Sequence, residues 1–589
     1  MSRRTFVAGA VAAATGLATS IGKAVAVPVS GHSSTAGGRR VAVLGGGIGG
    51  LTTAHELAER GFQVTVYERK AWGGKARSIP VPGTGRDGRL DLPGEHGFRF
   101  FPGFYQNLPD TMSRIPVAGN PHGVRDNLVV TDRGMGAWNG KAFYIPTSPA
   151  APSNFTPQAL CEYFMATFTA AGSVPPQDAA LIASKVLTFL TSGPKRRLEQ
   201  WENTSFARWM RADTLSPSGR ALLVDFPTTG LVAAKAGQAN TRTMGLMMEA
   251  AIHSTLRRGG YTAPDQLLNA PTNDAFIDPW LTHLRELGVR FNLGWTATGL
   301  TCDGGRITGA TAIGPTGPEQ IEADWFVLAV PVERAIPLLD DAVLTADPGL
   351  RRLRNLVTSW MNGVMIYTKR EVPICRGHVA YVGQPWALTS ISQAQFWERG
   401  FADRYGDGTA ADCLSVDLSD WDTPGILYGK PAKQCTRQEI VDEVLAQIRA
   451  ALPGGNSVLP DSIIHSWMVD PAITGQGTPN VANDEPLLIN TPSSWANRPE
   501  ATTRVPNLFL AADYVRSNVN LATMEGANEA GRAAANGILA ASGSAERPAK
   551  IATLFEPPEM QPFWFKDDID HTLGLPNQFD LLAPDWPRS

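Results

Sequence analysis

The chain has 589 residues, a formal net charge of −3, and a composition that is 43% hydrophobic and 18% charged. This length exceeds one ordinary domain, so we expect two or three domains with a large core. The charge gives no indication of a nucleic-acid partner. The five scattered cysteines have no CxxC spacing and indicate neither a zinc site nor a disulfide framework.

The first 38 residues have the order of a bacterial export signal followed by a linker. Arg3 and Arg4 precede a weakly apolar run, residues 7–22, and then the small-residue pattern Ala24-Val25-Ala26. Adjacent arginines and modest hydrophobicity are typical of twin-arginine signals. The sequence therefore predicts an exported bacterial protein, periplasmic or secreted. The alternative is a leader in which the two arginines carry no signal.

Residues 40–77 carry the most informative pattern in the chain. An apolar run, Val41–Leu44, leads into Gly45-x-Gly47-x-x-Gly50, a helical pattern and a second alternating run that ends at Glu68, 18 positions past Gly50. This order of strand, tight turn, helix, strand and acid predicts a βαβ site for an adenine dinucleotide.

Each residue of this pattern has a physical role. Gly45 permits the turn, Gly47 lets the backbone approach a pyrophosphate, and Gly50 lets the helix pack closely on the sheet. The helix N-terminus offers unpaired N–H groups to the phosphates, and Glu68 can accept hydrogen bonds from ribose hydroxyls. A second strand–GxGxxG–helix unit is absent from the sequence, so we expect no dedicated NAD(P)H domain.

Further along the chain, periodicity and apolar runs predict alternating helices and strands. We expect helices over residues 160–171, 179–190, 243–257, 274–289, 437–451 and 526–541, and strands over 290–292, 296–301, 306–313, 323–331 and 507–512. Distant strands should rejoin one sheet. The predicted fold class is α/β, a Rossmann-like domain assembled from discontinuous segments with an inserted α+β substrate domain.

The far end of the chain supports the opening motif. An apolar strand over residues 507–512 ends at Asp513, and a helix opens at Thr523-Met524. Asp513 can accept from sugar-like hydroxyls, as Glu68 can. The Met524 N–H, at a helix start, can face the negative charge that a flavin ring develops on reduction.

Three segments together resemble a known family. The sequences ERKAWGGKARS, EHGFRFFPGFYQN and residues 507–537 are similar to the FAD-dependent amine oxidase and phytoene desaturase superfamily, and the first two most resemble plant-type phytoene and zeta-carotene desaturases. The resemblance implies an FAD-binding domain at 39–115, 269–340 and 501–545. It leaves 116–268, mainly helical, and 341–500 to the substrate domain, with a tail at 546–589 after the signal and linker at 1–38.

The resemblance also implies which residues contact FAD. The turn residues would hold the pyrophosphate, Glu68 the ribose, Ala297 the adenine, Asp513 the ribityl or pyrophosphate region, and Met524 the flavin pyrimidine. The implied cofactor residues are Gly45, Gly47, Ile48, Gly50, Glu68, Arg69, Gly74, Lys75, Gly97, Phe98, Ala297, Asp513 and Met524. No metal ligand set is implied.

Arg99 departs from the family pattern, which has histidine at this position. A permanent cation beside the flavin could pair with a substrate carboxylate or polarise an oxygen, so Arg99 is the candidate catalytic residue. The alternative is a structural ion pair with Glu95 or Asp91. Other aromatic residues would line an apolar substrate cavity, although a run this dense is as often core. They are Phe100, Phe101, Tyr105 and Trp467.

Three functions follow from these expectations. The first is desaturation of a large, mostly apolar molecule by hydride transfer to flavin N5, with oxygen or a quinone as electron acceptor. The second is an amine or amino-acid oxidase that uses oxygen, and the third is a flavoprotein without net oxidation. The C-terminal tail is expected to be a surface strap, with a lid or an aromatic patch for peripheral membrane contact as the alternative.

Overall fold

Five strands that are far apart in the sequence form one parallel sheet. Their order is β23 (Leu508–Leu510), β13 (Trp325–Leu328), β1 (Arg40–Leu44), β2 (Gln63–Glu68) and β9 (Arg290–Leu293). Val41 of β1 pairs with Trp325 on one side and Val64 on the other. The strands β1, β13 and β23 are almost entirely buried, as parallel strands are when helices cover both sides of a sheet, whereas the edge strand β9 is partly exposed.

The structure is a computed structural model that describes residues 39–146, 154–170, 174–398 and 400–580. The predicted signal and linker, residues 1–38, and the last nine residues of the predicted tail lie outside the described residues. Among the residues described, no helix combines the length and the apolar character needed to cross a membrane.

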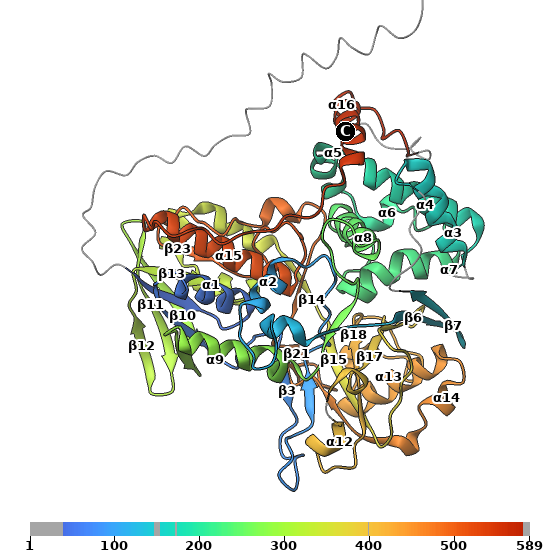
Figure 1. Cartoon of the computed structure of the whole chain (residues 1–589), viewed down its shortest axis with the longest axis horizontal. Helices are drawn as coiled ribbons and strands as arrows, with labels where there is room; N and C mark the ends of the chain where they lie inside the picture. Colours follow the sequence, from blue (N-terminus) through green and yellow to red (C-terminus); the bar gives the residue numbers. More distant parts are fainter. Residues whose placement is uncertain (1–38, 147–153, 171–173, 399, 581–589) are drawn as a thin grey trace, which may run out of the picture. The chain divides into compact units, whose positions relative to one another are not determined.

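Two helices from opposite ends of the chain lie side by side over this sheet (Figure 1). They are α1 (Ile48–Ala58) and α15 (Met524–Ala541). A Cβ on Gly531 of α15 would lie 2.6 Å from the Gly49 carbonyl oxygen of α1, so the backbones approach as closely as glycine allows. The helix α9 (Asp278–Glu286) is joined to α1 because Trp280 donates a hydrogen bond to Nδ1 of His55 at 3.1 Å.

A second, seven-stranded sheet forms the substrate half. Its order is β19 (Ile464–Val469), β15 (Asn362–Thr368), β18 (Asp412–Leu418), β17 (Thr389–Ser392), β16 (Val379–Tyr381), β6 (Arg133–Trp138) and β7 (Lys141–Pro146). The helix α13 (Arg437–Ala451) packs on it and begins with a capping box between Thr436 and Glu439. The sequence predicts that residues 116–268 are mainly helical, but β6 and β7 of this stretch join strands from 341–500.

The remaining stretch of 116–268 is helical and binds the described part of the tail. Its main helices are α3 (Pro157–Ala170), α4 (Pro176–Thr191), α5 (Pro194–Glu199) and α8 (Thr241–Thr255). The tail helix α16 (Gln561–Thr572) packs on α4 and α5, where Trp564 donates to the Leu190 carbonyl at 2.7 Å and Asp567 pairs with Arg196 at 2.9 Å. Residues 546–580 therefore include a segment firmly packed on the helical part.

The shorter elements complete the fold. A three-stranded antiparallel sheet consists of β10 (Thr296–Asp303), β11 (Arg306–Gly314) and β12 (Gly317–Ile321). The other elements are β3 (Ser78–Pro80), β4 (Pro93–Glu95), α2 (Asn107–Ser113), β5 (Leu128–Val130), α6 (Phe206–Trp209), α7 (Pro217–Arg220), β8 (Gln266–Leu268), α10 (Val332–Ala335), α11 (Asp341–Ala346), β14 (Val357–Ser359), α12 (Phe401–Arg404), α14 (Gly455–Val458), β20 (Ile473–Thr474), β21 (Ala482–Asn483) and β22 (Leu487–Ile489).

Candidate cofactor and active site

A cavity of about 570 Å³ lies at the carboxyl ends of β1, β2, β13 and β23. In an open parallel sheet, this edge is where ligands bind. Segments from both halves of the chain form its wall, among them residues 45–49, 67–71, 73–77, 96–99, 295–298, 329–331, 511–513 and 522–524. All of the predicted cofactor residues except Gly50 are in this wall, and Arg99 is there as well.

Gly50 instead lies behind the wall, where it sets the packing of α1 on the sheet. A Cβ at this position would be 2.0 Å from the Gly45 carbonyl oxygen. Gly45 itself has a φ of +117°, and its own Cβ would be 2.5 Å from the Ala329 carbonyl oxygen. Both positions therefore require glycine, Gly45 for the turn and Gly50 for the close packing of α1, as the spacing predicts.

Gly47 differs from Gly45 and Gly50, because the space that its Cβ would occupy is open. The nearest heavy atom to a Cβ on Gly47 is the Gly74 Cα, at 3.9 Å. Gly47 is also the N-cap of α1, and no side chain caps this helix end. Bare backbone and uncapped N–H groups thus face a cavity that a side chain would fill, which fits a pyrophosphate.

Glu68 lies at the end of β2 and shapes the turn. One carboxylate oxygen accepts from the Gly46 N–H at 2.8 Å, and the other accepts from the Lys70 N–H at 2.8 Å. A carboxylate has about four lone-pair sites, so Glu68 keeps acceptor capacity for a ribose hydroxyl.

The basic residues of the cavity are paired with acids. Arg69 donates to Asp484 at 2.7 Å, and Lys75 lies 3.5 Å from Glu333 and donates to the Pro486 carbonyl. Burial raises the pKa of Asp484, but the hydrogen bond and charge of Arg69 outweigh it, so the pKa is lowered overall. Burial raises the pKa of Glu333, and the attraction of Lys75 offsets this only in part.

The C-terminal residues complete the wall from the opposite end of the chain. Asp513 follows β23, and Met524 is the first residue of α15. Thr523 caps α15 by accepting from the Gly526 N–H at 3.0 Å. The Met524 N–H lies within the first turn, where backbone N–H groups have no partner within the helix.

Arg99 lies between the cofactor wall and the substrate half. Its Nε is 3.8 Å from a Glu95 carboxylate oxygen, and its terminal nitrogen donates to the Gly97 carbonyl. Asp91, the other partner considered, instead accepts from Thr84 and Gly85. The structure thus contains the Arg99–Glu95 ion pair while leaving Arg99 in the cavity wall.

Asp417 is a wall residue that the sequence did not indicate. It lies on β18, only 4% exposed, with no hydrogen-bond partner for Oδ1. Burial raises its pKa to about 7, although the charge of Arg99 acts in the opposite direction. An acid within an apolar strand pattern carries no motif, so only the fold brings it to the cavity.

The aromatic residues predicted to line a substrate cavity lie elsewhere. Phe101 and Tyr105 are buried in the main core, and Trp467 packs on the core of the substrate half. Phe100 is partly exposed and makes an edge contact with His378 at 5.1 Å between ring centroids. Within the aromatic run at residues 98–105, Phe98 is in the wall of the cofactor cavity, whereas Phe101 and Tyr105 follow the alternative reading and pack in the core.

An apolar cavity of about 120 Å³ adjoins the cofactor cavity on the side of the helical part. The two share Met361, Leu487, Ala522 and Thr523 as wall residues. The rest of the smaller wall is mostly aliphatic: Leu231, Val232, Ala234, Ala239, Thr243, Met244, Leu488, Ile489, Asn490 and Leu521. No motif marks these residues, because they come from several elements brought together by the fold.

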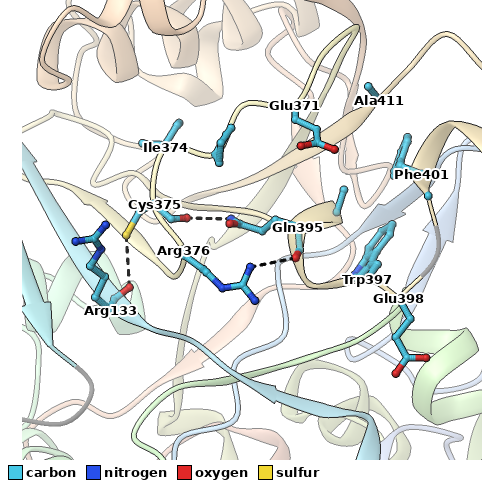
Figure 2. Close-up of a pocket in the computed structure, with 13 residues that line it drawn as sticks. Arg133, Glu371, Ile374, Cys375, Arg376, Gln395, Trp397, Glu398, Phe401 and Ala411 are labelled. Atoms are coloured by element: carbon cyan, nitrogen blue, oxygen red, sulfur yellow. Dashed lines mark hydrogen bonds between the residues drawn. The ribbon is translucent and has the colours of Figure 1, made fainter.

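A separate cavity of about 650 Å³ lies on the substrate half (Figure 2). Several of its polar groups contact one another: Gln395 donates to the Cys375 carbonyl at 2.9 Å, and Arg376 donates to the Gln395 carbonyl at 3.5 Å. Arg133 lies over the Tyr144 ring. This cavity contains none of the predicted cofactor residues.

Comparison with known proteins agrees with this geometry. The family described as flavin containing amine oxidoreductase matches residues 48–539. Zeta-carotene desaturase of Arabidopsis thaliana is 22% identical over 548 residues, covering 85% of each protein. The zeta-carotene desaturase of Synechocystis is 24% identical over 539 residues, covering 85% of this chain and 97% of that protein.

Solved structures share the fold at low sequence identity. Putrescine oxidase bound to putrescine aligns with a TM-score of 0.55 at 14% identity, over 85% of this chain and 99% of that one. Cyclohexylamine oxidase from Brevibacterium oxydans aligns with a TM-score of 0.54 at 14% identity, over 87% and 100%. The family match spans most of the chain. The chain therefore belongs to the flavin-containing amine oxidoreductase family and is an FAD-dependent oxidoreductase.

Proposed function

We propose that this protein desaturates a large, mostly apolar organic molecule. The observation that carries the proposal is the aliphatic cavity that adjoins the cofactor cavity and shares four wall residues with it. Apolar walls bind apolar substrate and exclude water, and polar groups placed at few points orient the ligand. The similarity to zeta-carotene desaturases supports the same substrate class.

The chain's own residues would hold FAD through its phosphates and sugars. Gly47 and the N-terminus of α1 would receive the pyrophosphate, Glu68 the ribose, and Asp513 the ribityl or pyrophosphate region. Ala297 would present backbone to the adenine, and Met524 to the flavin pyrimidine. When bound, FAD supplies a two-electron acceptor for a hydride from a substrate C–H bond.

The remaining task of the protein is positioning. The aliphatic wall around Val232, Met244 and Leu488 would hold a substrate chain so that one carbon reaches the cofactor cavity. Hydride removal itself requires no acid or base from the protein. Arg99, close to the substrate half, would remain paired with Glu95 while an uncharged substrate is bound.

Oxidation of an amine is the second candidate. Asp417 favours it, because a buried carboxyl group with a free oxygen at the cavity could receive an ammonium group. A flavoprotein without net oxidation is the third.

Anaerobic mixing of the purified yellow protein with a panel of compounds separates the three. We expect isoprenoid hydrocarbons to bleach the flavin absorbance and amines to leave it unchanged. Bleaching by amines, with peroxide release in air, would replace the proposal with an amine oxidase. Bleaching by no compound, in protein whose flavin is still photoreduced, would indicate the non-oxidative alternative.

We further propose that oxygen or a quinone reoxidises the flavin and that the protein is exported with its cofactor bound. The single GxGxxG unit and the twin-arginine pattern at Arg3 and Arg4 support these proposals. An acceptor panel after substrate reduction tests the first. For the second, replacing both arginines with lysine should retain the protein in the cytoplasm. An apolar substrate and a quinone would both be met at a membrane surface, so peripheral contact is part of this proposal.

A further inference from the structure

Asp417 is a buried acid with an unused oxygen in the wall of the cofactor cavity. It is 4% exposed, and its Oδ1 has no hydrogen-bond partner. Buried polar atoms almost always have partners, because an unpaired one costs free energy. A carboxyl oxygen that is both buried and unpaired, at the boundary between cofactor and substrate halves, points to a ligand or a proton as its missing partner.

The fold makes room for this carboxyl group on the cavity side. Asp417 lies opposite Gly363 of β15 and Thr389 of β17 in the sheet. Its oxygens lie against Gly97, where a Cβ would be only 2.9 Å from Oδ1 and 3.2 Å from Oδ2. The absence of a side chain at Gly97 thus lets the carboxyl group reach the stretch 96–99, which faces the cavity.

The groups around Asp417 bring the pKa of its carboxyl group close to neutral pH. The charged and titratable groups that face it are Arg99, Glu95 and His378, together with the Phe98 backbone N–H. Burial raises the pKa, and Glu95 adds to this, while Arg99, His378 and the N–H of Phe98 lower it, which gives a value of about 7. A group with such a value can accept a proton at one stage and release it at another.

We propose that Asp417 is the base that accepts the substrate proton during desaturation. The inference rests on the proposed function. Forming a C=C bond breaks one C–H bond on each of two neighbouring carbons. One hydrogen leaves as hydride and reduces the bound FAD by two electrons. The other leaves as a proton to Oδ1 of Asp417, and the electron pair of its C–H bond becomes the new π bond. The neutral carboxylic acid then returns its proton to solvent.

Three other titratable wall residues already have charged partners, and Asp513 is assigned to the cofactor. His96 directs Nδ1 at Asp470, 2.5 Å away, with Glu485 at 3.6 Å. Glu333 lies beside Lys75 at 3.5 Å. Glu485 accepts two hydrogen bonds from Arg77, at 2.9 and 3.0 Å. Asp417 is thus distinguished by its free oxygen and by its place on the substrate sheet.

The test compares the holoenzyme with Asp417→Asn, Asp417→Glu and the control Asp420→Asn. Asp420 is a buried acid on the same segment, but it accepts hydrogen bonds from Asp422 and Thr423 and lies outside the cavity wall. The first readout is independent of turnover. Infrared difference spectra between about pH 5 and about pH 9 should contain a carboxylic acid band that titrates near neutrality in the wild type and in Asp420→Asn. Asp417→Asn should lose part of this band, and the part that remains should belong to Glu529, whose pKa burial also raises to about 7.

The second readout is anaerobic flavin reduction by substrate across pH. Asp417→Asn should slow it by about 10²- to 10⁴-fold and remove the pH dependence near 7, with photoreduction and FAD content unchanged. Asp417→Glu should restore part of the rate. Wild-type rates and an unchanged pH profile in Asp417→Asn would overturn the inference alone. If no compound reduced the flavin of the wild type, the proposed function would be overturned and, with it, the role of Asp417.

Discussion

Gly49 of α1 lies directly against the Ala511 carbonyl group at the end of β23, so closely that a Cβ on Gly49 would be 1.9 Å from the carbonyl oxygen. The two residues are separated by most of the chain. Their contact joins the first βαβ unit to the last strand, and the cofactor cavity lies between these segments. The fit of these two backbones therefore determines whether the cavity forms.

Replacement of Gly49 by alanine should destabilise the whole protein. The added methyl group meets backbone, which cannot move aside as a side chain can. We expect the free energy of unfolding in urea to fall by about 3 kcal/mol or more, with loss of bound flavin. Gly237→Ala is the control, because nothing lies within 4 Å of a Cβ at that position. Equal stability of the two variants would contradict the close approach.

Replacement of Gly47 by alanine should separate cofactor binding from folding. The new methyl group enters the open cavity, 3.9 Å from the nearest atom, and occupies the space assigned to the pyrophosphate. We expect an unchanged melting temperature of the flavin-free protein and an FAD dissociation constant raised by about tenfold or more. Flavin fluorescence titration measures the constant. Undiminished affinity would place the pyrophosphate elsewhere.

Asp417 should make stability depend on pH in a defined direction. Burial raises its folded pKa to about 7, so folding favours the protonated form. Its stabilising contribution is complete below the unfolded carboxyl pKa of about 4 and is lost as pH rises through about 7, with a magnitude of about 4 kcal/mol. Asp417→Asn mimics the protonated form, so its stability relative to the wild type should increase across this range.

Glu529 provides an internal comparison for the pH measurement. Burial raises its pKa to about 7 as well, with the charge of Glu525 adding to the effect. Glu529→Gln should therefore also gain stability relative to the wild type as pH rises. Glu529 is absent from the cavity wall, so this variant should leave the pH profile of flavin reduction unchanged.

The ion pair between the tail and the helical part should matter for stability but not for flavin binding. Asp567 accepts from Arg196 at 2.9 Å and from the Gly193 N–H at 2.9 Å, and both charged side chains are almost fully buried. Asp567→Ala leaves the arginine without its partner, which costs about 3–5 kcal/mol. Urea unfolding and protease cleavage near residue 560 should detect this change. Unaltered resistance to protease would show that other contacts hold the tail.

Narrowing the aliphatic cavity should affect substrate and leave the cofactor unchanged. Val232 lines the smaller cavity without lining the cofactor cavity. Val232→Trp should slow the reduction of the flavin by long apolar substrates by about tenfold or more. The indole ring would overlap with the bound substrate and remove its contacts with the wall, and a loss of about 1.4 kcal/mol corresponds to a factor of ten. Photoreduction should be unchanged. Ile426→Trp, at an exposed position outside both cavities, is the control.

Local sequence predicted those parts of the site whose geometry is local. The turn from Gly45 to Gly50 and the acid at Glu68 depend on neighbours within one βαβ unit, and the structure places them around one cavity, with Gly50 behind its wall. The helix α13 matched its predicted range, residues 437–451, because its apolar period and its cap at Thr436 agree. Asp513 and Met524 were indicated by an apolar strand that ends at an acid and by a helix start, and the family resemblance assigned them to parts of the cofactor.

The remaining parts depend on contacts that no single segment encodes. In the sequence, Asp417 is one acid within a buried strand. It reaches the cavity only because β18 packs against Gly97 in the fold. A sequence segment rich in aromatic residues looks the same whether it lines a cavity or fills a core. In the structure, Phe101 and Tyr105 fill the core. The predicted helix 274–289 begins instead as a π-helical segment, Asn273–Ile277, and becomes α-helical at Asp278, just before Pro279.

The position of β23 at the edge of the parallel sheet has a consequence for biosynthesis. This strand and α15 are among the last parts of the chain to leave the ribosome, yet they supply one side of the cofactor cavity. A nascent chain that has completed only its first βαβ unit holds half of the binding surface. We therefore expect flavin loading to follow the synthesis of β23 and α15, and a chain that stops before residue 508 to lack the prosthetic group.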